Sequence, residues 1–480
     1  MTGLLWERLR ESLHTHRDRP AVTDPDGTAS YGEILTRAVE LSESLGLGIR
    51  PGQDRPRIAL SAGNSAHYPV ALLAALGSGA VPFLFDPQWG ETEIASAIRS
   101  CGIDLLLHDR PLPAGSAGPA RPLAGPLQVS EATGPRERPE LLPTTELCRY
   151  TTGSTGYPSC VEFSGTAVTG AATSWLAGTG LRPDDRILCF AGLANGLAFN
   201  TSLVPGLLAG SVLHLAGGLP TAGHVLRYVR QTGPTRLTGF PALYASLLRR
   251  TAPAPELAGI RVAISSGAPL PPDDARALID RYGLPVANYY GIAETGPLTF
   301  DREPALERGL GAPLPGVEFR IPPGARAGEP APISVRSSSM GSRYLNAPGL
   351  LEHRLDQDGF YLTGDEGHLE SGLLHLSGRS GKHINVGGRK VDPHEVAEVL
   401  RTVPGVTDAL VLEVTRSDGD KALGALVAAP AHVGTDAVRA HCRGLLAPYK
   451  VPERLAVVDR IPASSIGKPR LAAARALLEG

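Results

Sequence analysis

Glycine and hydroxyl residues are concentrated in one run, residues 150–158, and their chemistry suits the binding of a polyphosphate. Two glycines three positions apart free the backbone to bend and to present its N–H groups to an anion. The neighbouring hydroxyl side chains add further hydrogen-bond donors. The candidate phosphate-binding residues of this loop are Thr151, Thr152, Gly153, Ser154, Thr155 and Gly156.

The surroundings of this loop favour a binding function over a linker. A Gly/Ser/Thr-rich run alone is typical of ordinary loops and linkers. Here strand-like segments flank it at 147–150 and 161–163, and a helix-like segment follows at 166–175, a pattern in which a linker fits poorly. The Gly-Lys-Ser/Thr ending of the common nucleotide-binding loop, which supplies a lysine and a magnesium ligand, is missing from the run.

Four later blocks also contain side chains with defined chemistry. Residues 288–295 read NYYGIAET and residues 358–365 read DGFYLTGD, so each block places a carboxylate close to tyrosine and glycine. Residues 378–390 read GRSGKHINVGGRK, and residues 462–470 read PASSIGKPR. In this order, with the loop and a small-residue turn at 263–270, they resemble the motifs of the adenylate-forming enzymes. That superfamily includes acyl-CoA synthetases, peptide-synthetase adenylation domains, luciferases and stand-alone aryl-acid ligases, and the chain looks most like the last of these.

The resemblance implies a role for each side chain. Glu294 would be a ligand of Mg²⁺ bridging the ATP phosphates, since magnesium favours one or two carboxylates together with phosphate and water. Tyr290 would stack on adenine, and Asp365 would accept both ribose hydroxyls. Lys468 would bridge the substrate carboxylate and the α-phosphate, where charge develops in the transition state, so Glu294 and Lys468 are the predicted catalytic residues. The predicted nucleotide-binding residues beyond the loop are Gly267, Ala268, Pro269, Tyr289, Tyr290, Gly291, Asp365 and Arg379.

Each of these positions also has a plainer explanation. A glutamate after a core tyrosine can be a surface residue, and a C-terminal Gly-Lys is usually a solvated charge. Asp-Gly at 358–359 is a common turn. The order of the blocks along the chain is what favours the functional interpretation.

The chain departs from the superfamily motifs at four positions. Ser159 and Cys160 stand where the loop usually has Lys and Gly, and Ala293 stands where a threonine touches the α-phosphate. Gly381 aligns with the usual Asp or Lys of the hinge and is the predicted hinge residue, because glycine absorbs large φ/ψ changes. The departures predict slower adenylation, or another cation in place of the loop lysine, without affecting the fold.

Spacing back from the Leu-Leu-Ala-Gly at 207–210 places Asn195 at the floor of the acyl pocket. Aryl-acid ligases of the superfamily have His-Asn at this point, whereas α-amino-acid activators have an aspartate for the substrate ammonium. A neutral amide suits a ring hydroxyl or aniline nitrogen better than an ammonium ion, so an aromatic carboxylate is predicted. The alternative is an asparagine that satisfies turn backbone. The predicted acyl-pocket residues are Asn195, Gly239, Phe240, Ser266 and Leu298.

Composition and charge exclude several function classes. The chain has 480 residues, 42% of them hydrophobic and 20% charged, and a net charge of -2. These values favour a soluble protein of two or three domains and give no electrostatic case for nucleic acid or an anionic membrane. The apolar runs are too short to span a bilayer. Five scattered cysteines without metal-binding spacing predict a reducing cytoplasm.

The elements that position these residues alternate between helix and short apolar strand, as at 58–60, 64–76 and 80–85. Such alternation predicts parallel βαβ units and an α/β fold. The resemblance implies a large N-terminal domain, residues 1–377, made of βαβ-type subdomains and a β-barrel-like one. It also implies a small, mobile α+β C-terminal lid domain, residues 378–480. The Pro/Gly-rich stretch 111–145 is predicted to be a low-order surface excursion.

By resemblance, the chain is predicted to be an ATP- and Mg²⁺-dependent ligase of a carboxylic acid. The carboxylate would attack the α-phosphate of ATP to give acyl-AMP and pyrophosphate, and lid rotation about Gly381 would then withdraw Lys468 and admit a nucleophile. The predicted acceptor is a thiol of CoA or of a carrier protein, and the actinomycete-like composition suggests secondary metabolism. The alternatives are a ligase for a fatty, α- or β-amino acid, a non-catalytic protein that binds nucleotide or acyl-AMP, and a subunit that needs a partner protein.

Overall fold

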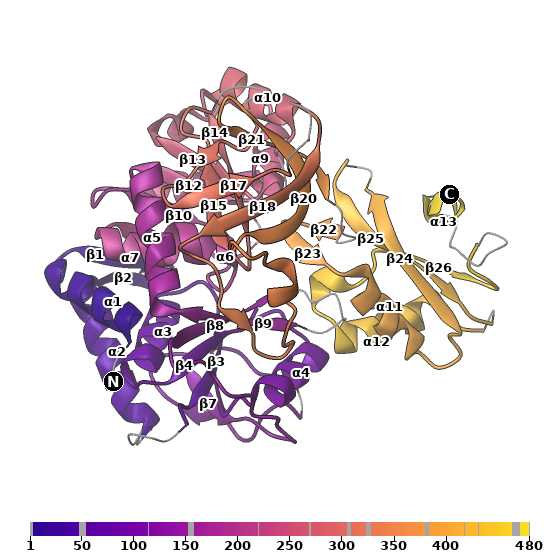
Figure 1. Ribbon diagram of the computed structural model, residues 1–480, viewed down its shortest axis with the longest axis horizontal. Helices are drawn as coiled ribbons and strands as arrows, with labels where there is room; N and C mark the ends of the chain where they lie inside the picture. Colours follow the sequence, from indigo (N-terminus) through magenta and orange to yellow (C-terminus); the bar gives the residue numbers. More distant parts are fainter. Residues whose placement is uncertain are drawn as a thin grey trace.

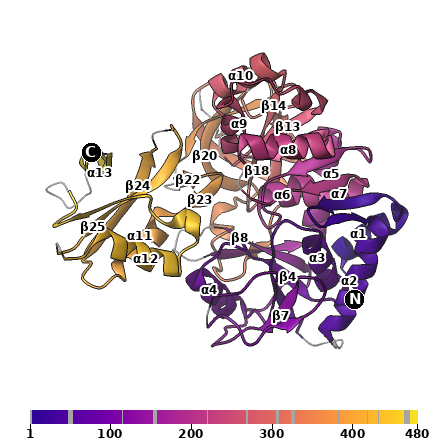
Figure 2. The same cartoon turned by 180° about the vertical axis from the view of Figure 1, so that it is seen from behind.

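The computed structural model describes residues 3–479 apart from 48–53, 114, 152–157, 219, 268–269, 305–308, 323–327, 380–383, 417, 431 and 463–470. A large N-terminal part contains two mixed sheets and a smaller antiparallel sheet, and the C-terminal part lies beside it at one end of the molecule (Figures 1 and 2). This arrangement confirms the predicted α/β class with a large N-terminal and a small C-terminal part.

The eight-stranded sheet carries the predicted phosphate loop. Its order is β19-β9-β8-β4-β3-β5-β7-β6. Strands β3, β4, β5 and β8 pair in parallel, as the βαβ pattern predicted. Strands β8 and β9 form an antiparallel pair on either side of residues 152–157. The strands are β3 (Arg57–Ser61), β4 (Val81–Leu84), β5 (Leu105–His108), β6 (Arg121–Pro122), β7 (Gln128–Glu131), β8 (Thr145–Thr151), β9 (Ser159–Ser164) and β19 (Arg343–Tyr344).

The stretch predicted as a low-order excursion contributes two strands to the edge of this sheet. Strand β7 pairs with β5, and β6 pairs with β7, both antiparallel. Neither strand was predicted, because they are short and lie among Pro and Gly residues that weaken the local pattern.

The nine-stranded sheet has the order β16-β15-β14-β13-β12-β10-β11-β1-β2. Its six central strands, from β14 to β1, pair in parallel, and the edges are antiparallel. The strands are β1 (Pro20–Asp24), β2 (Gly27–Ser30), β10 (Arg186–Cys189), β11 (Val212–Leu215), β12 (Arg236–Gly239), β13 (Val262–Ser265), β14 (Val286–Ile292), β15 (Gly296–Phe300) and β16 (Ala312–Pro313).

Helices connect the parallel strands and pack between and around the two sheets (Figure 1). One continuous hydrophobic core contains residues of both sheets together with α1, α2, α3 and α5, and α3 is buried over nearly its whole length. The helices are α1 (Leu4–Thr15), α2 (Tyr31–Leu45), α3 (His67–Gly77), α4 (Glu91–Cys101), α5 (Gly165–Thr179), α6 (Gly196–Ala198), α7 (Val204–Ala209), α8 (Ala222–Thr232), α9 (Pro241–Leu248) and α10 (Pro272–Tyr282), with η2 (Pro255–Gly259) as a short 3₁₀ turn.

A π-helical turn, η1 (Phe199–Leu203), joins α6 to α7. Such turns are uncommon and occur often at functional sites. This one begins four residues after Asn195, the predicted floor of the acyl pocket.

A four-stranded antiparallel sheet, β17-β18-β20-β21, occupies the place of the predicted barrel-like subdomain. Its strands are β17 (Val317–Arg320), β18 (Ala331–Ser337), β20 (Tyr361–Glu370) and β21 (Leu373–Arg379), and η3 (Glu352–Arg354) precedes β20. Strand β20 therefore carries the predicted ribose ligand Asp365.

The C-terminal part has hydrophobic cores of its own, which begin with Ile384. A two-stranded ribbon, β22 (Ile384–Val386) and β23 (Arg389–Val391), precedes a three-stranded sheet of β24 (Asp408–Thr415), β25 (Lys421–Ala428) and β26 (Arg454–Val458). The helices are α11 (Pro393–Arg401), α12 (Thr435–Leu445), η4 (Pro448–Lys450) and α13 (Leu471–Glu479). A separate core is what the two-domain prediction expects, and the boundary at 377/378 stays a prediction.

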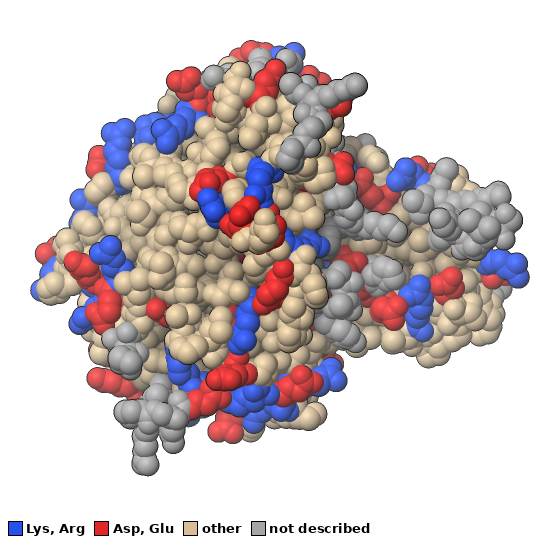
Figure 3. Space-filling model, in the orientation of Figure 1, with Lys and Arg blue, Asp and Glu red and all other residues tan. Residues whose placement is uncertain are grey.

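On the face drawn in Figure 3, acidic and basic side chains are interspersed and no large area has a single sign. Within the described ranges, none of the helices combines the length and the apolar character that crossing a membrane requires.

Candidate functional site

A cavity of about 270 Å³ lies where the two large sheets meet the C-terminal ribbon. It brings together residues from β4, β8, β14, the α6–η1 segment and η4. The residues that line it are Leu84, Asp86, Trp89, Tyr150, Thr151, Pro158, Ser159, Ala194, Asn195, Gly196, Leu197, Asn200, Phe240, Ser266, Gly267, Tyr289, Gly291, Ile292, Ala293, Glu294, Tyr344, Leu350, Arg354, Thr363, Gly388, Arg389, Lys390, Tyr449 and Lys450.

The two ends of the phosphate loop lie at this cavity. Thr151 ends β8 and pairs in register with Ser159, the first residue of β9, and both line the cavity. The predicted loop residues Thr152, Gly153, Ser154, Thr155 and Gly156 lie outside the described residues.

Ser159 and Cys160, the two departures in the loop motif, face different surroundings. Ser159 lines the cavity. Cys160, the next residue on the strand, is fully buried in the cluster that includes Cys101 and Cys148, because successive side chains of a strand point to opposite faces. Burial raises the pKa of the Cys160 thiol well above its usual value, so Cys160 acts as a small apolar core residue behind the loop.

Glu294 follows the end of β14 and lines the cavity. The Tyr344 hydroxyl donates a hydrogen bond of 2.6 Å to its Oε1. The second carboxylate oxygen has no hydrogen-bond partner among the described residues and is available to a cation. A hard oxygen ligand at a phosphate-binding cavity fits Mg²⁺.

Tyr289 and Tyr290 lie on opposite sides of strand β14. Tyr289 lines the cavity, whereas the Tyr290 hydroxyl donates to Asp365 Oδ2 at 2.5 Å. Asp365 and Tyr290 are both buried and lie just outside the cavity lining. Thr363, two residues before Asp365, does line it, and its hydroxyl accepts the Asp365 N–H at 3.0 Å.

The small-residue turn at 263–270 and the neighbouring Phe240 meet the C-terminal ribbon. Phe240, Ser266 and Gly267 line the cavity. Gly267 has φ +87°, and a Cβ there would lie 2.9 Å from the Gly388 carbonyl oxygen. The Asn385 amide also donates to the Gly267 carbonyl. Close approach of the ribbon therefore requires glycine at 267.

Asn195 lies at the cavity and also caps a helix, so its position is compatible with both interpretations of the sequence. It lines the cavity, and it is also the N-cap of α6, where its Oδ1 accepts the Leu197 N–H at 2.9 Å. The alternative, an asparagine that satisfies turn backbone, is therefore present in the structure. The Nδ2 of Asn195 has no hydrogen-bond partner in the described part of the chain.

Several predicted residues lie elsewhere. Gly239 is buried within β12 and Leu298 within β15, and neither lines the cavity. Arg379 ends β21 with its backbone paired to Asp365. Ala268, Pro269, the hinge Gly381 and the catalytic candidate Lys468 lie outside the described residues.

Two buried cations at the cavity were not predicted. Lys450 lines it from the C-terminal part and contacts Glu395 and Glu93 at 2.5 and 3.1 Å. Arg149 lies behind the wall formed by Gly196, Asn200 and Ala293 and is 6% exposed. The sequence signal for Arg149 was a charge inside the apolar strand that leads into the loop.

Comparisons with known proteins identify the family of the chain. The sequence profile of the AMP-binding enzyme family matches residues 9–345, and the profile of its C-terminal domain matches residues 395–468. A feruloyl-CoA synthase from Amycolatopsis sp. is 30% identical over 462 residues, which cover 92% of each chain. A 3-hydroxybenzoate–CoA ligase from Aromatoleum sp. is 26% identical over 496 residues, covering 96% of this chain and 94% of the relative.

The fold is shared with solved structures of the same kind. An o-succinylbenzoate CoA synthetase from Bacillus subtilis superposes with a TM-score of 0.82 at 23% identity over 98% of both chains. The structure of an amide bond synthetase from Marinactinospora thermotolerans has the same TM-score at 24% identity, covering 98% of this chain and 99% of that one. On these matches, the chain belongs to the AMP-binding enzyme family and is an ATP-using, AMP-forming acid ligase.

Proposed function

We propose that this ligase activates an aromatic carboxylic acid and transfers the acyl group to the thiol of CoA. The observation that carries the proposal is that one cavity is lined by Thr151, Glu294 and Asn195, the residues predicted to contact the phosphates, Mg²⁺ and the acyl group. The names of the relatives, a feruloyl-CoA synthase and a 3-hydroxybenzoate–CoA ligase, support both the acid class and the acceptor.

In the first step a carboxylate oxygen of the acid attacks the α-phosphorus of ATP. The bond from that phosphorus to the oxygen bridging the β-phosphate breaks, so the products are acyl-AMP and pyrophosphate. Bound Mg²⁺ would neutralise phosphate charge, and Glu294 is the residue that would hold it. Thr151 and the loop it begins would orient the phosphates, and Lys468 would stabilise the charge that develops at the α-phosphate.

In the second step the thiolate sulfur attacks the acyl carbonyl carbon, and AMP leaves with the oxygen that came from the acid. Rotation of the C-terminal part about Gly381 would exchange Lys468 for the acceptor. In the arrangement described here, the ribbon residues Gly388, Arg389 and Lys390 line the cavity. These residues are therefore candidates to contact the incoming thiol substrate.

The acid specificity follows from the lining of the pocket. Phe240 and Tyr289 provide aromatic surface, and the Asn195 amide provides a neutral polar group. A flat ring can pack against the aromatic side chains, whereas an ammonium group would lack a carboxylate partner at Asn195. A benzoate or cinnamate ring bearing a hydrogen-bonding substituent fits best.

The test is pyrophosphate release from Mg-ATP across benzoates, hydroxybenzoates, aminobenzoates, cinnamates, fatty acids and amino acids, without an acceptor. We expect release with aryl acids alone, and then consumption of CoA thiol when CoA is added. Release restricted to fatty or amino acids would refute the acid class. No release with any acid, together with measurable ATP binding, would instead indicate a nucleotide-binding protein without turnover.

A further inference from the structure

Arg149 is a buried charge with no counter-ion among the residues that the structure describes. It lies on β8, and its side chain packs between two aromatic rings, with the guanidinium carbon 4.5 Å from the centre of Phe163 and 5.4 Å from that of Phe199. One of its nitrogens, Nη2, donates to the Ala293 carbonyl at 3.2 Å. The other, Nη1, is buried and has no hydrogen-bond partner among the described residues. In the described part of the chain, Arg149 forms no ion pair with a carboxylate.

The guanidinium nevertheless keeps its charge at neutral pH. Burial lowers the pKa of Arg149 to about 10, and the nearby Tyr289, Glu294 and Tyr68 side chains act in the opposite direction. Burying a cation with an unsatisfied N–H costs free energy, because no protein anion among the described residues replaces its lost hydration. Stacking on Phe163 and Phe199 offsets part of this free-energy cost. It does not provide a hydrogen-bond acceptor for Nη1.

Gly196 lies on the wall of the cavity, beside Nη1. A Cβ at Gly196 would lie 3.6 Å from Arg149 Nη1 and 4.0 Å from Asn200 Nδ2. Gly196 and Asn200 both line the cavity. The two donors, Arg149 Nη1 and Asn200 Nδ2, therefore lie on the same side of Gly196, at the wall of the cavity. The π-helical turn η1 contributes to this, because it holds Asn200 toward the pocket.

Gly196 is next to Asn195 on the segment before η1, in the region proposed to hold the acyl group. The reacting carboxylate must instead meet the phosphates, between Thr151 and Glu294. We propose that Arg149 and Asn200 form an anion subsite for a second acidic group on the substrate, so that the preferred acid is an aromatic dicarboxylate. This inference rests on the proposed function and specifies its substrate class.

The chemistry of the subsite should discriminate strongly between acids with and without a second acidic group. A guanidinium N–H and an amide N–H suit one carboxylate oxygen, and the positive charge suits its anionic form. An acid without the second group leaves both donors unsatisfied in a buried site, which is the situation in which binding sites reject an analogue most effectively. A ring hydroxyl satisfies the donors but not the charge, and we expect it to rank between the two.

The experiment compares benzoate, the hydroxybenzoates and the three benzenedicarboxylates in substrate-dependent pyrophosphate release. For wild type we expect one dicarboxylate to exceed benzoate in kcat/KM by at least about a hundredfold. Arg149→Met keeps the length of the buried stem and removes the charge. It should lower kcat/KM for that dicarboxylate by a similar factor, mainly through KM, while changing the value for benzoate less than about threefold.

A matched control is Arg236→Met. Arg236 is also a buried arginine, but it is paired with Asp185 at 3.0 Å and lies away from the cavity lining. We expect this variant to be destabilised with an unchanged preference between dicarboxylate and benzoate. Arg149→Met, by contrast, should unfold at the same temperature as wild type or higher, because removing an unpaired buried charge is neutral or stabilising.

Several results would overturn the inference. An equal loss with every acid would place Arg149 at the reacting carboxylate or the phosphate, and no preference for a second anion in wild type would remove the subsite. If no acid supports pyrophosphate release, the proposed function fails. Calorimetric binding of the benzenedicarboxylates to wild type and Arg149→Met then still decides the subsite, which is refuted if the two proteins bind them equally.

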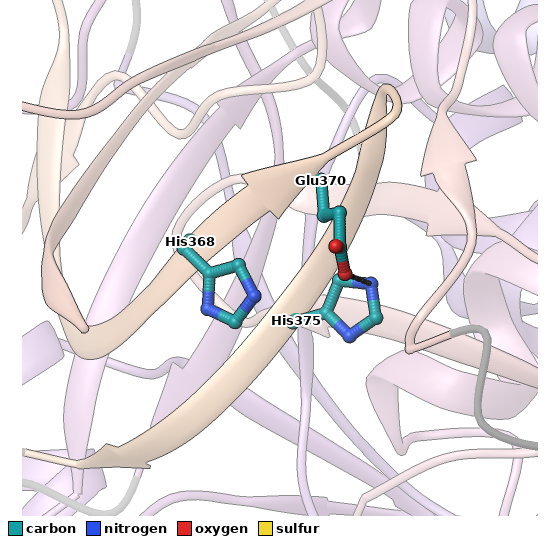
Figure 4. A group of neighbouring side chains, drawn as sticks. All are labelled: His368, Glu370 and His375. Carbon is teal, nitrogen blue, oxygen red and sulfur yellow. Dashed lines mark ion pairs between the residues drawn. The ribbon is translucent and has the colours of Figure 1, made fainter. Parts of the chain in front are cut away.

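A second inference comes from the β20–β21 hairpin, which belongs to a different sheet from Arg149. Figure 4 shows His368 and Glu370 on β20 and His375 on β21 with their side chains on one side of the hairpin. His368 and His375 are directly opposite in register, and Glu370 is two residues after His368, on the same face. Their ligand atoms all lie within 4.8 Å of one another, with His375 Nε2 and Glu370 Oε2 3.9 Å apart.

The chemistry of this group suits a transition metal. Two imidazoles and one carboxylate form a common three-residue set for Zn²⁺, with ligand distances of about 2.0–2.2 Å and a fourth position for water. His368 Nδ1 is buried and has no hydrogen-bond partner among the described residues. A bound metal ion would provide the missing partner for this nitrogen. We infer a Zn²⁺ site at the hairpin, reached by side-chain rotations that bring the three ligand atoms closer together.

The test is titration with Co²⁺, whose visible absorption reports tetrahedral nitrogen and oxygen ligands, followed by displacement with Zn²⁺. We expect one ion per chain for wild type and at least about tenfold weaker binding for His375→Ala and Glu370→Gln. His432→Ala removes an exposed histidine elsewhere on the C-terminal part and should bind as wild type. Equal affinity of wild type and His375→Ala would refute the site.

Discussion

Replacement of Lys450 by Met tests how the C-terminal part is held against the cavity. The Lys450 ammonium is 1% exposed and contacts Glu395 Oε1 at 2.5 Å and Glu93 Oε1 at 3.1 Å. Glu93 belongs to α4 of the N-terminal part and is fixed further by the Ala447 N–H at 3.2 Å. Lys450 is thus the cation in a buried contact across the interface.

The expected loss follows from what the substitution leaves behind. Lys450→Met removes the ammonium and leaves two buried carboxylates facing each other. Breaking a buried pair by deleting one partner lowers the free energy of unfolding by about 3–5 kcal/mol. The loss should depend on pH, because one of the carboxylates can take up a proton in response.

The direction of the pH dependence comes from Glu395. Burial raises the pKa of Glu395 to about 7, although Lys450 opposes the shift. A carboxyl group with a raised pKa in the folded state contributes stability that is fully present below its unfolded pKa and is lost as pH rises through the folded value. Without Lys450 the pKa of Glu395 rises further. We therefore expect the full loss at pH 8 and a smaller loss at pH 6.

The assay is urea unfolding at pH 6 and pH 8, followed by circular dichroism and tryptophan fluorescence. The double variant Lys450→Met/Glu395→Gln serves as the control, since it leaves one carboxylate and should show a weaker pH dependence. A loss below about 1 kcal/mol at pH 8, typical of exposed pairs, would refute the reasoning. An equal loss at both pH values would refute the role of Glu395.

Three further predictions concern the reaction itself. Glu294→Gln keeps an acceptor for the Tyr344 hydroxyl but removes the charge that would hold Mg²⁺. Pyrophosphate release should therefore fall at least about a hundredfold and should recover partly at high Mg²⁺. Substitution of an exposed glutamate, Glu40→Gln, is the control, and equal rates for the two variants would contradict the metal role. Asn195→Asp keeps the N-cap, since Asp and Asn cap helices equally well, and should shift the substrate preference toward acids with a cationic amine; an unchanged profile would remove Asn195 from the pocket. Lys468→Ala should abolish acyl-AMP formation while the opening of supplied acyl-AMP stays largely intact, and equal loss of both steps would count against the two-state lid.

Much of the fold could be predicted because its signals are local. Alternating helical and apolar segments predicted the parallel βαβ units, and β3, β4 and α3 lie within a few residues of their predicted ranges. The Gly-rich loop was placed correctly between two strands because strand, turn and helix signals followed one another directly. The β6–β7 edge was missed because its strands are short and surrounded by turn residues.

Only those site residues that belong to a sequence motif could be predicted. Thr151, Asn195 and Glu294 line the cavity and lie far apart in the sequence, but each belongs to a recognisable block. The Tyr344 hydroxyl on Glu294 is a contact over 50 residues, and no spacing rule relates the two.

The buried cations were missed for a related reason. Lys450 contacts Glu93, which lies more than 350 residues earlier in the chain. Arg149 lies next to Gly196 and Asn200, which are also distant from it in the sequence. Sequence patterns cannot report the lack of a counter-ion, because that depends on every neighbour in space. Leu298 and Gly239 are the opposite case. Spacing along the sequence predicted that they line the acyl pocket, but both lie within strands and do not line the cavity.

The central claim, attack of the acid on the α-phosphorus of ATP, is tested most directly by following oxygen-18 from the carboxylate. The acid that gives the fastest pyrophosphate release would be labelled in both carboxylate oxygens and turned over with ATP and CoA, and the products analysed by mass spectrometry. Adenylation predicts one labelled oxygen in AMP and none in pyrophosphate, because the acid oxygen stays on the α-phosphorus when the thiol displaces AMP. Label in inorganic phosphate with formation of ADP, or no label in any nucleotide product, would contradict this chemistry.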